Sequence, residues 1–237
     1  MPAHHGPEAR TAESGQFLSG PGCSPSPNTN LAFRAPVDWC RSSLVGILIL
    51  VRFAGVCQGS ETNTSASRPA NWAIKLEQPG LSGLHQVTTN LYRGAQPTTR
   101  GMAELKAMGI KTIINLRNWH SDDDEVLGLG LKQGRLHMEP WRTKDEDVVR
   151  FLKLATNTNN LPVFVHCQRG ADRTGMVCAM YRVVVCAWTK QEAIREMKEG
   201  GFGFNPAWKN IVAYIERADI AKIKHQVGIA FPDGGSR

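Results

Sequence analysis

A cysteine and an arginine separated by five residues are the side chains of this sequence best suited to chemistry. Cys167 follows the apolar run 162–166, and Arg173 opens a segment with helical periodicity. A loop between a strand and a helix directs backbone N–H groups at a bound anion. Those dipoles favour a thiolate, which is the nucleophilic form of cysteine. Because a guanidinium can bind two phosphate oxygens and transition-state charge, the pair predicts nucleophilic attack on phosphate esters.

The other residues of this loop have supporting roles. Gly170 permits a tight turn, and the hydroxyl of Thr174 can ease the departure of the thiolate. His166, buried beside the loop, is expected to order backbone carbonyls and favour the thiolate rather than act as a base. Asp172 could pair with Arg169, assist the water step or fix the loop, and the last role is favoured. The expected phosphate-binding residues are Gln168, Arg169, Gly170, Ala171, Asp172, Arg173 and Thr174.

The pattern His-Cys-x-x-Gly-x-x-Arg-Thr-Gly at 166–175 resembles the signature loop of the protein tyrosine phosphatase superfamily. The run Gly-Ala-Asp-Arg-Thr-Gly at 170–175 resembles bacterial, often exported, dual-specificity-type tyrosine phosphatases in particular. The similarity extends over 90–97, 109–117 and 200–204. It implies a compact α/β domain, a cysteinyl-phosphate intermediate, and neither a metal nor an organic cofactor.

The resemblance also implies an aspartate upstream of the cysteine that protonates the leaving oxygen. The matching stretch is 140–147, which contains no Trp-Pro-Asp. Asp145 is the first choice on position, because it lies just before a predicted helix. Asp147 is expected to cap that helix, and Glu146 and Glu139 remain alternatives.

Apolar runs alternate with amphipathic segments from about residue 82 onward. Strands are predicted at 91–93, 111–116, 135–138 and 162–166, and helices at 98–108, 121–125, 147–156, 174–185, 189–199 and from 205–206 onward. This alternation predicts one α/β domain with a central, mostly parallel, twisted sheet flanked by helices. The phosphate-binding loop would join a strand to a helix.

The chain divides into four segments by composition. Residues 1–59 are interpreted as a disordered leader with a signal peptide, because the apolar run 44–51 lies between basic and small residues. A linker at 60–82, a phosphatase domain at 83–224 and a C-terminal tail at 225–237 follow. Export to the periplasm or the medium is expected. A buried strand, an uncleaved membrane anchor and a cytoplasmic location are the alternatives for this region.

Composition excludes several other classes of protein. Hydrophobic residues make up 41% and charged residues 21%, which argues against disorder over most of the chain. The formal charge of +7 comes without basic runs interleaved with aromatics, so no nucleic-acid partner is expected. The six cysteines form no C-x-x-C pair, so no zinc site is expected. Membrane contact is expected only through an uncleaved N-terminal segment, and the protein is expected to be a monomer.

Three functions are compatible with the predicted loop. The leading one is the hydrolysis of phosphotyrosine in a phosphorylated protein, with phosphoserine, phosphothreonine or small phosphate esters as further substrates. An inositol-phosphate or phosphoinositide phosphatase is the second, although such enzymes often carry two lysines in the loop and this sequence has none there. A non-catalytic phosphate-binding module is the third. Intact Cys167 and Arg173 argue against it, because a binding module needs no nucleophile.

Overall fold

A computed structural model describes residues 68–229 of this chain. The predicted leader and signal peptide, residues 60–67 of the linker and the end of the tail lie outside the described residues. Among the helices that are described, none has the length and apolar character that crossing a bilayer requires.

Residues 68–229 contain one mixed sheet with the strand order β1-β2-β3-β6-β4-β5. The pairs β3–β6, β6–β4 and β4–β5 are parallel, whereas β1 and β2 extend the β3 edge as antiparallel strands. The central position in the parallel part therefore belongs to β6. The strands are β1 Ile74–Lys75, β2 His85–Gln86, β3 Leu91–Gly94, β4 Thr112–Asn115, β5 Lys132–Arg135 and β6 Val163–His166.

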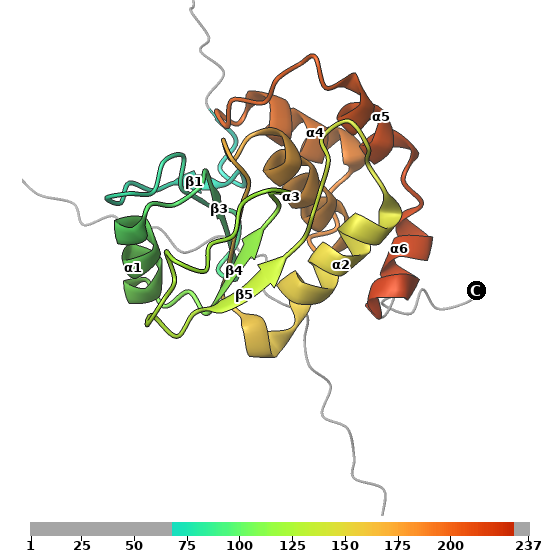
Figure 1. Cartoon of the computed structure of the whole chain (residues 1–237). Coiled ribbons are helices and arrows are strands. Elements are labelled where there is room, and N and C mark those ends of the chain that lie inside the picture. The colour runs from blue at the N-terminus through green and yellow to red at the C-terminus, as the bar shows by residue number, and fades with distance from the viewer. Residues whose placement is uncertain (1–67, 230–237) are drawn as a thin grey trace, which may run out of the picture. The chain divides into compact units, whose positions relative to one another are not determined.

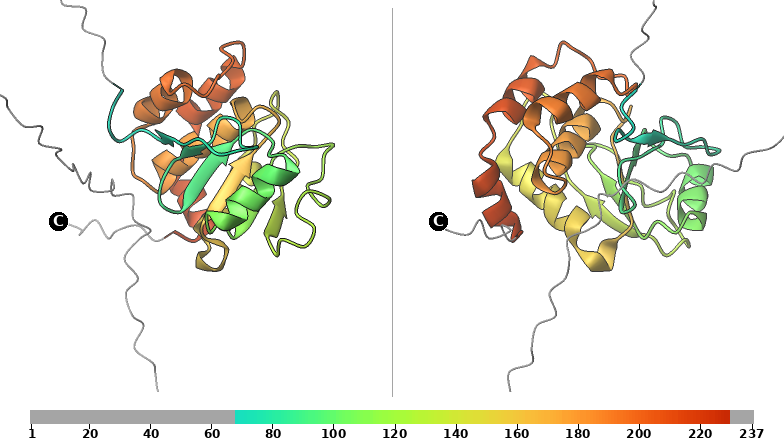
Figure 2. Two further views of the ribbon diagram at one scale, coloured as in Figure 1. Left: turned by 90° about the vertical axis from the view of Figure 1, so that its left-hand side faces the viewer. Right: turned by 180° about the vertical axis from the view of Figure 1, so that it is seen from behind.

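Helices cover both faces of the sheet (Figures 1 and 2). On one face α1 packs through Met102 and Leu105 against Ile113 and Phe164. The other face carries α2 and α3, with α4, α5 and α6 packed around α3. The helices are α1 Thr99–Ala107, α2 Asp145–Thr156, α3 Asp172–Val184, α4 Lys190–Glu199, α5 Lys209–Arg217 and α6 Ile220–Val227, with a 3-10 turn η1 at Thr158–Asn160. The predicted α/β architecture is confirmed.

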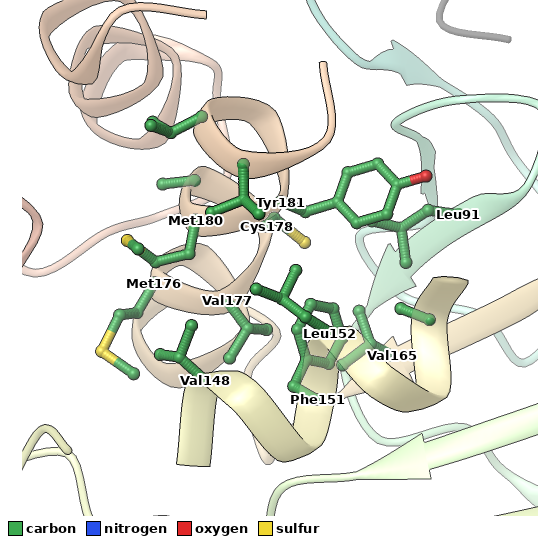
Figure 3. Packing of buried hydrophobic residues seen from close by; sticks show 14 of the residues in the cluster. Leu91, Val148, Phe151, Leu152, Val165, Met176, Val177, Cys178, Met180 and Tyr181 are labelled. Atoms are coloured by element: carbon green, nitrogen blue, oxygen red, sulfur yellow. The ribbon is translucent and has the colours of Figure 1, made fainter. Parts of the chain in front are cut away.

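The larger apolar cluster holds α2 and α3 against the centre of the sheet (Figure 3). Its labelled members come from β3, β6, α2 and α3, and they are Leu91, Val148, Phe151, Leu152, Val165, Met176, Val177, Cys178, Met180 and Tyr181. Fully burying side chains of this size contributes about 1.5–3 kcal/mol each. Since β6 and α3 flank the predicted loop, this packing fixes both ends of it.

Local sequence signals account for the helix ends. Thr98 caps α1 by accepting from the Gly101 amide at 3.1 Å. Thr189 and Glu192 form the predicted capping box at the start of α4. Such caps satisfy amides that have no partner inside a helix.

The structure corrects three predicted elements. Residues 121–125 form turns instead of a helix, because the side chain of Asp122 is bound to groups outside the segment. Strand β5 lies at Lys132–Arg135 rather than 135–138, because a largely exposed edge strand carries no apolar signal. The last predicted helix, α5, begins at Lys209, because Asn205 accepts from the Ala207 amide and forms a turn instead.

Two predicted domain boundaries also shift. The sheet already includes Ile74, and the amide of buried Ala73 donates to Glu196 at 2.6 Å, so the domain begins before residue 83. At the other end α6 continues to Val227, beyond the predicted boundary at 224.

Candidate active site

The predicted phosphate loop lies at the carboxyl edge of the sheet. Strand β6 ends at His166 and α3 begins at Asp172, so five residues connect them. The neighbouring strands β3 and β4 run parallel to β6 and end at the same level, Gly94 and Asn115 both pairing with His166. Open α/β sheets bind their ligands at this edge. The residues that follow all three strands therefore meet around Cys167.

Cys167 is 3% exposed and is not in a disulfide. Thr174, seven residues later in the first turn of α3, is fully buried. Its hydroxyl has no hydrogen-bond partner among the described residues. Buried hydroxyls are normally paired, so an unpaired one in this loop is available to a bound phosphate or to the sulfur.

Arg173 is anchored at one end of its guanidinium only. Its Nη1 donates to the carbonyls of Leu116 at 3.2 Å and Met138 at 3.4 Å, which follow β4 and β5. Its Nε and Nη2 donate to no residue within 68–229. The guanidinium is therefore fixed in orientation, while its Nε and Nη2 stay free for phosphate oxygens.

A second arginine, which the sequence analysis missed, holds the loop from β3. Arg93 is 2% exposed, and its Nη2 donates to the carbonyls of Gly170 at 2.7 Å and Ala171 at 3.5 Å. Its guanidinium stacks on Phe202 at 3.8 Å. Burial lowers the pKa of Arg93, opposed by nearby thiols and by Glu196, yet an arginine keeps its proton at neutral pH.

These contacts decide where the loop amides point. In a trans peptide unit the C=O of one residue and the N–H of the next point in opposite directions. The carbonyls of Gly170 and Ala171 face Arg93, and the carbonyl of Gln168 accepts from the Gln96 amide at 3.2 Å. The N–H groups of the following residues therefore point away from these partners. Backbone amides arranged in this way can bind an anion.

Gly170 is required by two features of this loop. Its φ is +69°, a conformation that side chains rarely adopt. A Cβ at this position would lie 2.3 Å from the carbonyl oxygen of Gly94. The loop can approach β3, and so reach Arg93, only with glycine there.

Among the other predicted residues of this region, some make contacts that hold the loop and others are exposed at the surface. The Asp172 carboxylate accepts from the Asn205 amide at 2.9 Å, which ties the loop to the 200–206 segment and supports the loop-fixing role. Gln168 and Arg169 are exposed at the loop tip. His166 is fully buried, with Nε2 3.0 Å from Asp122 Oδ2.

Asp145, the predicted proton donor, is the first residue of α2. Its carboxylate accepts from the Tyr214 hydroxyl at 3.0 Å and from Lys222 Nζ at 2.9 Å. The hydrogen bond from Lys222 is the main cause of a lowered pKa for Asp145. A carboxyl held in its ionised form between α5 and α6 is a poor proton donor, so these contacts argue against the assignment. Asp147 is similarly paired with Arg150.

Glu139 lies in a different setting from the other acids. Its carboxylate forms no hydrogen bond or ion pair with any residue of 68–229. It lines a cavity of about 350 Å³ together with Asn118, Trp119, His137, Arg142, Lys144 and Asp147. Met138, the neighbour of Glu139, carries the carbonyl that Arg173 contacts at 3.4 Å, which links this segment to the loop. Two exposed tryptophans, Trp119 and Trp141, stand in the segments that form it.

One group of side chains has the composition of a metal site. The ligand-type atoms of His120, Asp122 and Glu125 lie within 4.8 Å of one another. Both oxygens of Asp122 already accept hydrogen bonds from His166 and Gln96, so we assign no ion to this group.

Comparison with known proteins gives consistent matches to phosphatases. Residues 69–206, more than half of the chain, match the family described as DSP-PTPase phosphatase fused to NAD+ kinase. The dual specificity protein phosphatase TpbA of Pseudomonas aeruginosa is 33% identical over 191 residues, covering 79% of this chain and 84% of TpbA.

Two further relatives show the range of substrates among similar proteins. The crystal structure of a TpbA variant with pTyr aligns with a TM-score of 0.60 at 29% identity, covering 67% of this chain and 97% of that chain. An inositol diphosphatase of Arabidopsis thaliana is 25% identical over 154 residues, covering 60% of this chain and 73% of that protein.

Proposed function

Because this chain belongs to the family of DSP-PTPase phosphatases described as fused to NAD+ kinase, and is a phosphatase, we propose that it hydrolyses phosphotyrosine in proteins through Cys167. The observation that carries the proposal is the loop itself. Cys167 precedes a loop whose carbonyls are held by Arg93 and the Gln96 amide, and Arg173, six residues later, keeps Nε and Nη2 free. The relative crystallised with pTyr supports this choice of substrate.

The reaction proceeds in two displacements. The Cys167 thiolate attacks phosphorus, an S–P bond forms, and the bond to the tyrosine oxygen breaks as that oxygen receives a proton. Water then attacks phosphorus, and the S–P bond breaks to release phosphate and the thiolate. The loop amides and Arg173 stabilise the equatorial oxygens in both transition states. The unpaired hydroxyl of Thr174 donates to the departing sulfur.

We propose Glu139 as the proton donor in place of Asp145. Its carboxylate is not paired with a cation and lines the cavity in the segment that Arg173 contacts. Asp145 and Asp147 are each paired with a basic side chain, and the pKa of Asp145 is lowered mainly by its hydrogen bond from Lys222. Glu146 is exposed on α2.

A leaving-group comparison tests this assignment. Glu139→Gln should slow phenyl phosphate hydrolysis by about 10²-fold but p-nitrophenyl phosphate hydrolysis much less, because nitrophenolate needs little protonation. Asp145→Asn and Glu146→Gln serve as matched variants from the same region. If Asp145→Asn produces the leaving-group effect and Glu139→Gln does not, the donor is Asp145.

Two substitutions test the nucleophile, Cys167, and the phosphate-binding arginine, Arg173. Cys167→Ser should abolish hydrolysis of p-nitrophenyl phosphate, and retained turnover would refute the covalent mechanism. Arg173→Lys should reduce both kcat and phosphate affinity, because an ammonium cannot reproduce the planar fork. Unchanged kinetics in this variant would remove Arg173 from the site.

An inositol-phosphate substrate is the second candidate. The cavity that Glu139 lines carries the basic side chains of His137, Arg142 and Lys144, and one relative is named as an inositol diphosphatase. A panel of phosphotyrosine, phosphoserine and phosphothreonine peptides with inositol phosphates separates the candidates. A kcat/KM higher for an inositol phosphate than for every phosphopeptide would reverse their order.

We further propose that the protein is exported and monomeric. Export is supported by the apolar run 44–51 between basic and small residues. N-terminal sequencing of the mature protein tests it, and an intact Met1 would count against it. Light scattering of the purified protein tests the monomer.

A further inference from the structure

We infer that Asp122 is a positioning residue for the nucleophile, acting on Cys167 through His166. The chemical consequence rests on the proposed function of Cys167. Asp122 belongs to an acidic stretch in which Asp123 and Asp124 are exposed, yet it is itself only 2% exposed. Burying an ionised carboxylate costs several kcal/mol unless it is paired and hydrogen-bonded. The structure shows which groups offset that cost.

Both carboxylate oxygens of Asp122 have partners around the phosphate loop. Oδ2 lies 3.0 Å from Nε2 of His166, and Oδ1 accepts from Nε2 of Gln96 at 2.7 Å. The Gln96 amide oxygen in turn accepts from Nη1 of Arg117 at 3.1 Å. The chain of contacts thus joins the segments that follow β3, β4 and β6.

The contacts of His166 indicate what Asp122 does to it. Nε2 faces the carboxylate of Asp122, and Nδ1 lies 3.4 Å from the carbonyl oxygen of Cys167. The carboxylate of Asp122 is an acceptor, so Nε2 carries the proton that this carboxylate binds. The hydrogen bond fixes the orientation of a fully buried ring.

This arrangement affects the nucleophile in two ways. The ring orients the Cys167 carbonyl, so the N–H of Gln168 in the same peptide unit points the opposite way, into the anion site. The dipole of that N–H also stabilises the thiolate over the thiol. Loss of Asp122 should therefore weaken both the anion site and the thiolate.

The surroundings of Asp122 contain other ionisable groups. Nε2 of His120 lies 3.7 Å from its Oδ1 and 3.5 Å from Glu125. Burial acts to raise the pKa of Asp122, but the hydrogen bond and the charge of His166, with Gln96, outweigh it and lower that pKa. His166 is the only one of these neighbours in contact with Cys167 among the described residues.

The test follows the reactivity of Cys167 without requiring turnover. Full-length protein is alkylated with iodoacetamide from pH 4 to 9, and the modified cysteine is identified by peptide mapping. Asp122→Asn should raise the pH midpoint of Cys167 alkylation by about one unit, which is a tenfold loss of thiolate below the midpoint. The value of kcat/KM for p-nitrophenyl phosphate should fall about tenfold at low pH and recover only in part above both midpoints, because the anion site stays weakened. Asp124→Asn, an exposed neighbour, is the matched control and should leave both unchanged.

A double-mutant cycle and a variant-free measurement complete the test. Asp122→Asn should add nothing to the midpoint shift of His166→Asn, since it acts through that ring. Nitrogen NMR of wild-type protein labelled in histidine should show a proton on Nε2 of His166, the nitrogen that faces Asp122. Additive shifts, an unmoved midpoint in Asp122→Asn, or an Nε2 without a proton would each overturn the inference.

The same data separate this inference from the proposed function. An unmoved midpoint in a protein that hydrolyses phosphotyrosine refutes only the role of Asp122. A shifted midpoint in a protein whose Cys167→Ser variant still turns over substrate refutes only the covalent mechanism.

Discussion

The Arg93→Met variant removes the buried guanidinium under the phosphate loop while keeping an unbranched side chain of similar length. It deletes the 2.7 Å hydrogen bond to the Gly170 carbonyl and leaves that carbonyl buried without its donor. An orphaned buried acceptor costs about 1–3 kcal/mol. The stacking on Phe202 contributes about 0.5–2 kcal/mol more. Because desolvation of the charge is also relieved, we expect the free energy of unfolding to fall by about 2–3 kcal/mol.

The effect on activity should exceed what this loss of stability explains. With its carbonyl released, the Gly170 peptide can rotate, and the Ala171 N–H then no longer points at the phosphate. Removing one preorganised donor from an anion site costs about 10²-fold in rate. We therefore expect kcat/KM for p-nitrophenyl phosphate to fall by about 10–100-fold at a temperature where the variant is fully folded. Stability is measured by thermal unfolding, where about 2 kcal/mol corresponds to roughly 4–8 °C in a domain of this size.

Two further variants separate charge from packing in this prediction. Arg93→Lys keeps the charge but not the two-carbonyl geometry, and should lie between wild type and Arg93→Met. Arg100→Met, an exposed arginine on α1, is the matched control and should change stability by less than about 0.5 kcal/mol. An Arg93→Met protein with a lowered Tm but wild-type kcat/KM would refute the link between Arg93 and the direction of the loop amides.

Three other outcomes follow from the same structure. Gly170→Ala should abolish activity and lower Tm, because its Cβ would lie 2.3 Å from the last carbonyl of β3; a fully active variant would contradict the loop geometry. Burial raises the pKa of Cys178 to about 11, so iodoacetamide at pH 7 should modify Cys167 and leave Cys178 unmodified in peptide maps. The lowered pKa of Asp145 means that its ion pair stabilises the fold above the ordinary value of 3.8 and is lost as pH falls through the lowered value. Asp145→Asn should therefore lower Tm by about 2 °C at most at pH 7, and the difference should vanish in acid.

The phosphate loop could be predicted from sequence because its chemistry is local. A strand, a cysteine, five residues, an arginine and a helix are adjacent in the chain, so spacing alone brings them together. The same is true of the capping box of α4 and of the apolar runs that form β4 and β6. The structure agrees with the predicted capping box and with the predicted strands β4 and β6.

The residues that hold the loop could not be predicted in this way. Arg93 contacts Gly170 across 77 positions of sequence, and Asp122 contacts His166 across 44. These contacts exist because β3 and β4 pair with β6 in parallel, and no periodicity reports strand order. One signal was nevertheless present. An arginine inside the apolar strand β3 must find buried acceptors, because an unpaired buried charge is too costly.

The acidic stretch 121–125 is a second case in which contacts between distant residues could not be predicted from the sequence. Its composition suits a helix N-terminus, and this physical rule led to the predicted helix at 121–125. Burial of one carboxylate among several cannot be read from composition. Once Asp122 binds His166 and Gln96, its segment is held in turns, and tertiary contacts override the local preference.

The way in which the loop is held also bears on substrate choice. Its carbonyls are fixed from outside by Arg93, the Gln96 amide and His166, so phosphate binding depends on backbone amides rather than on the side chains at the loop tip. Gln168 and Arg169 are exposed, and no side-chain contact of theirs belongs to that support. Backbone amides recognise any phosphate monoester equally. Discrimination between phosphotyrosine and other esters must therefore come from side chains outside the loop, and the 350 Å³ cavity that Glu139 lines, next in sequence to the Met138 carbonyl that Arg173 contacts, is the candidate.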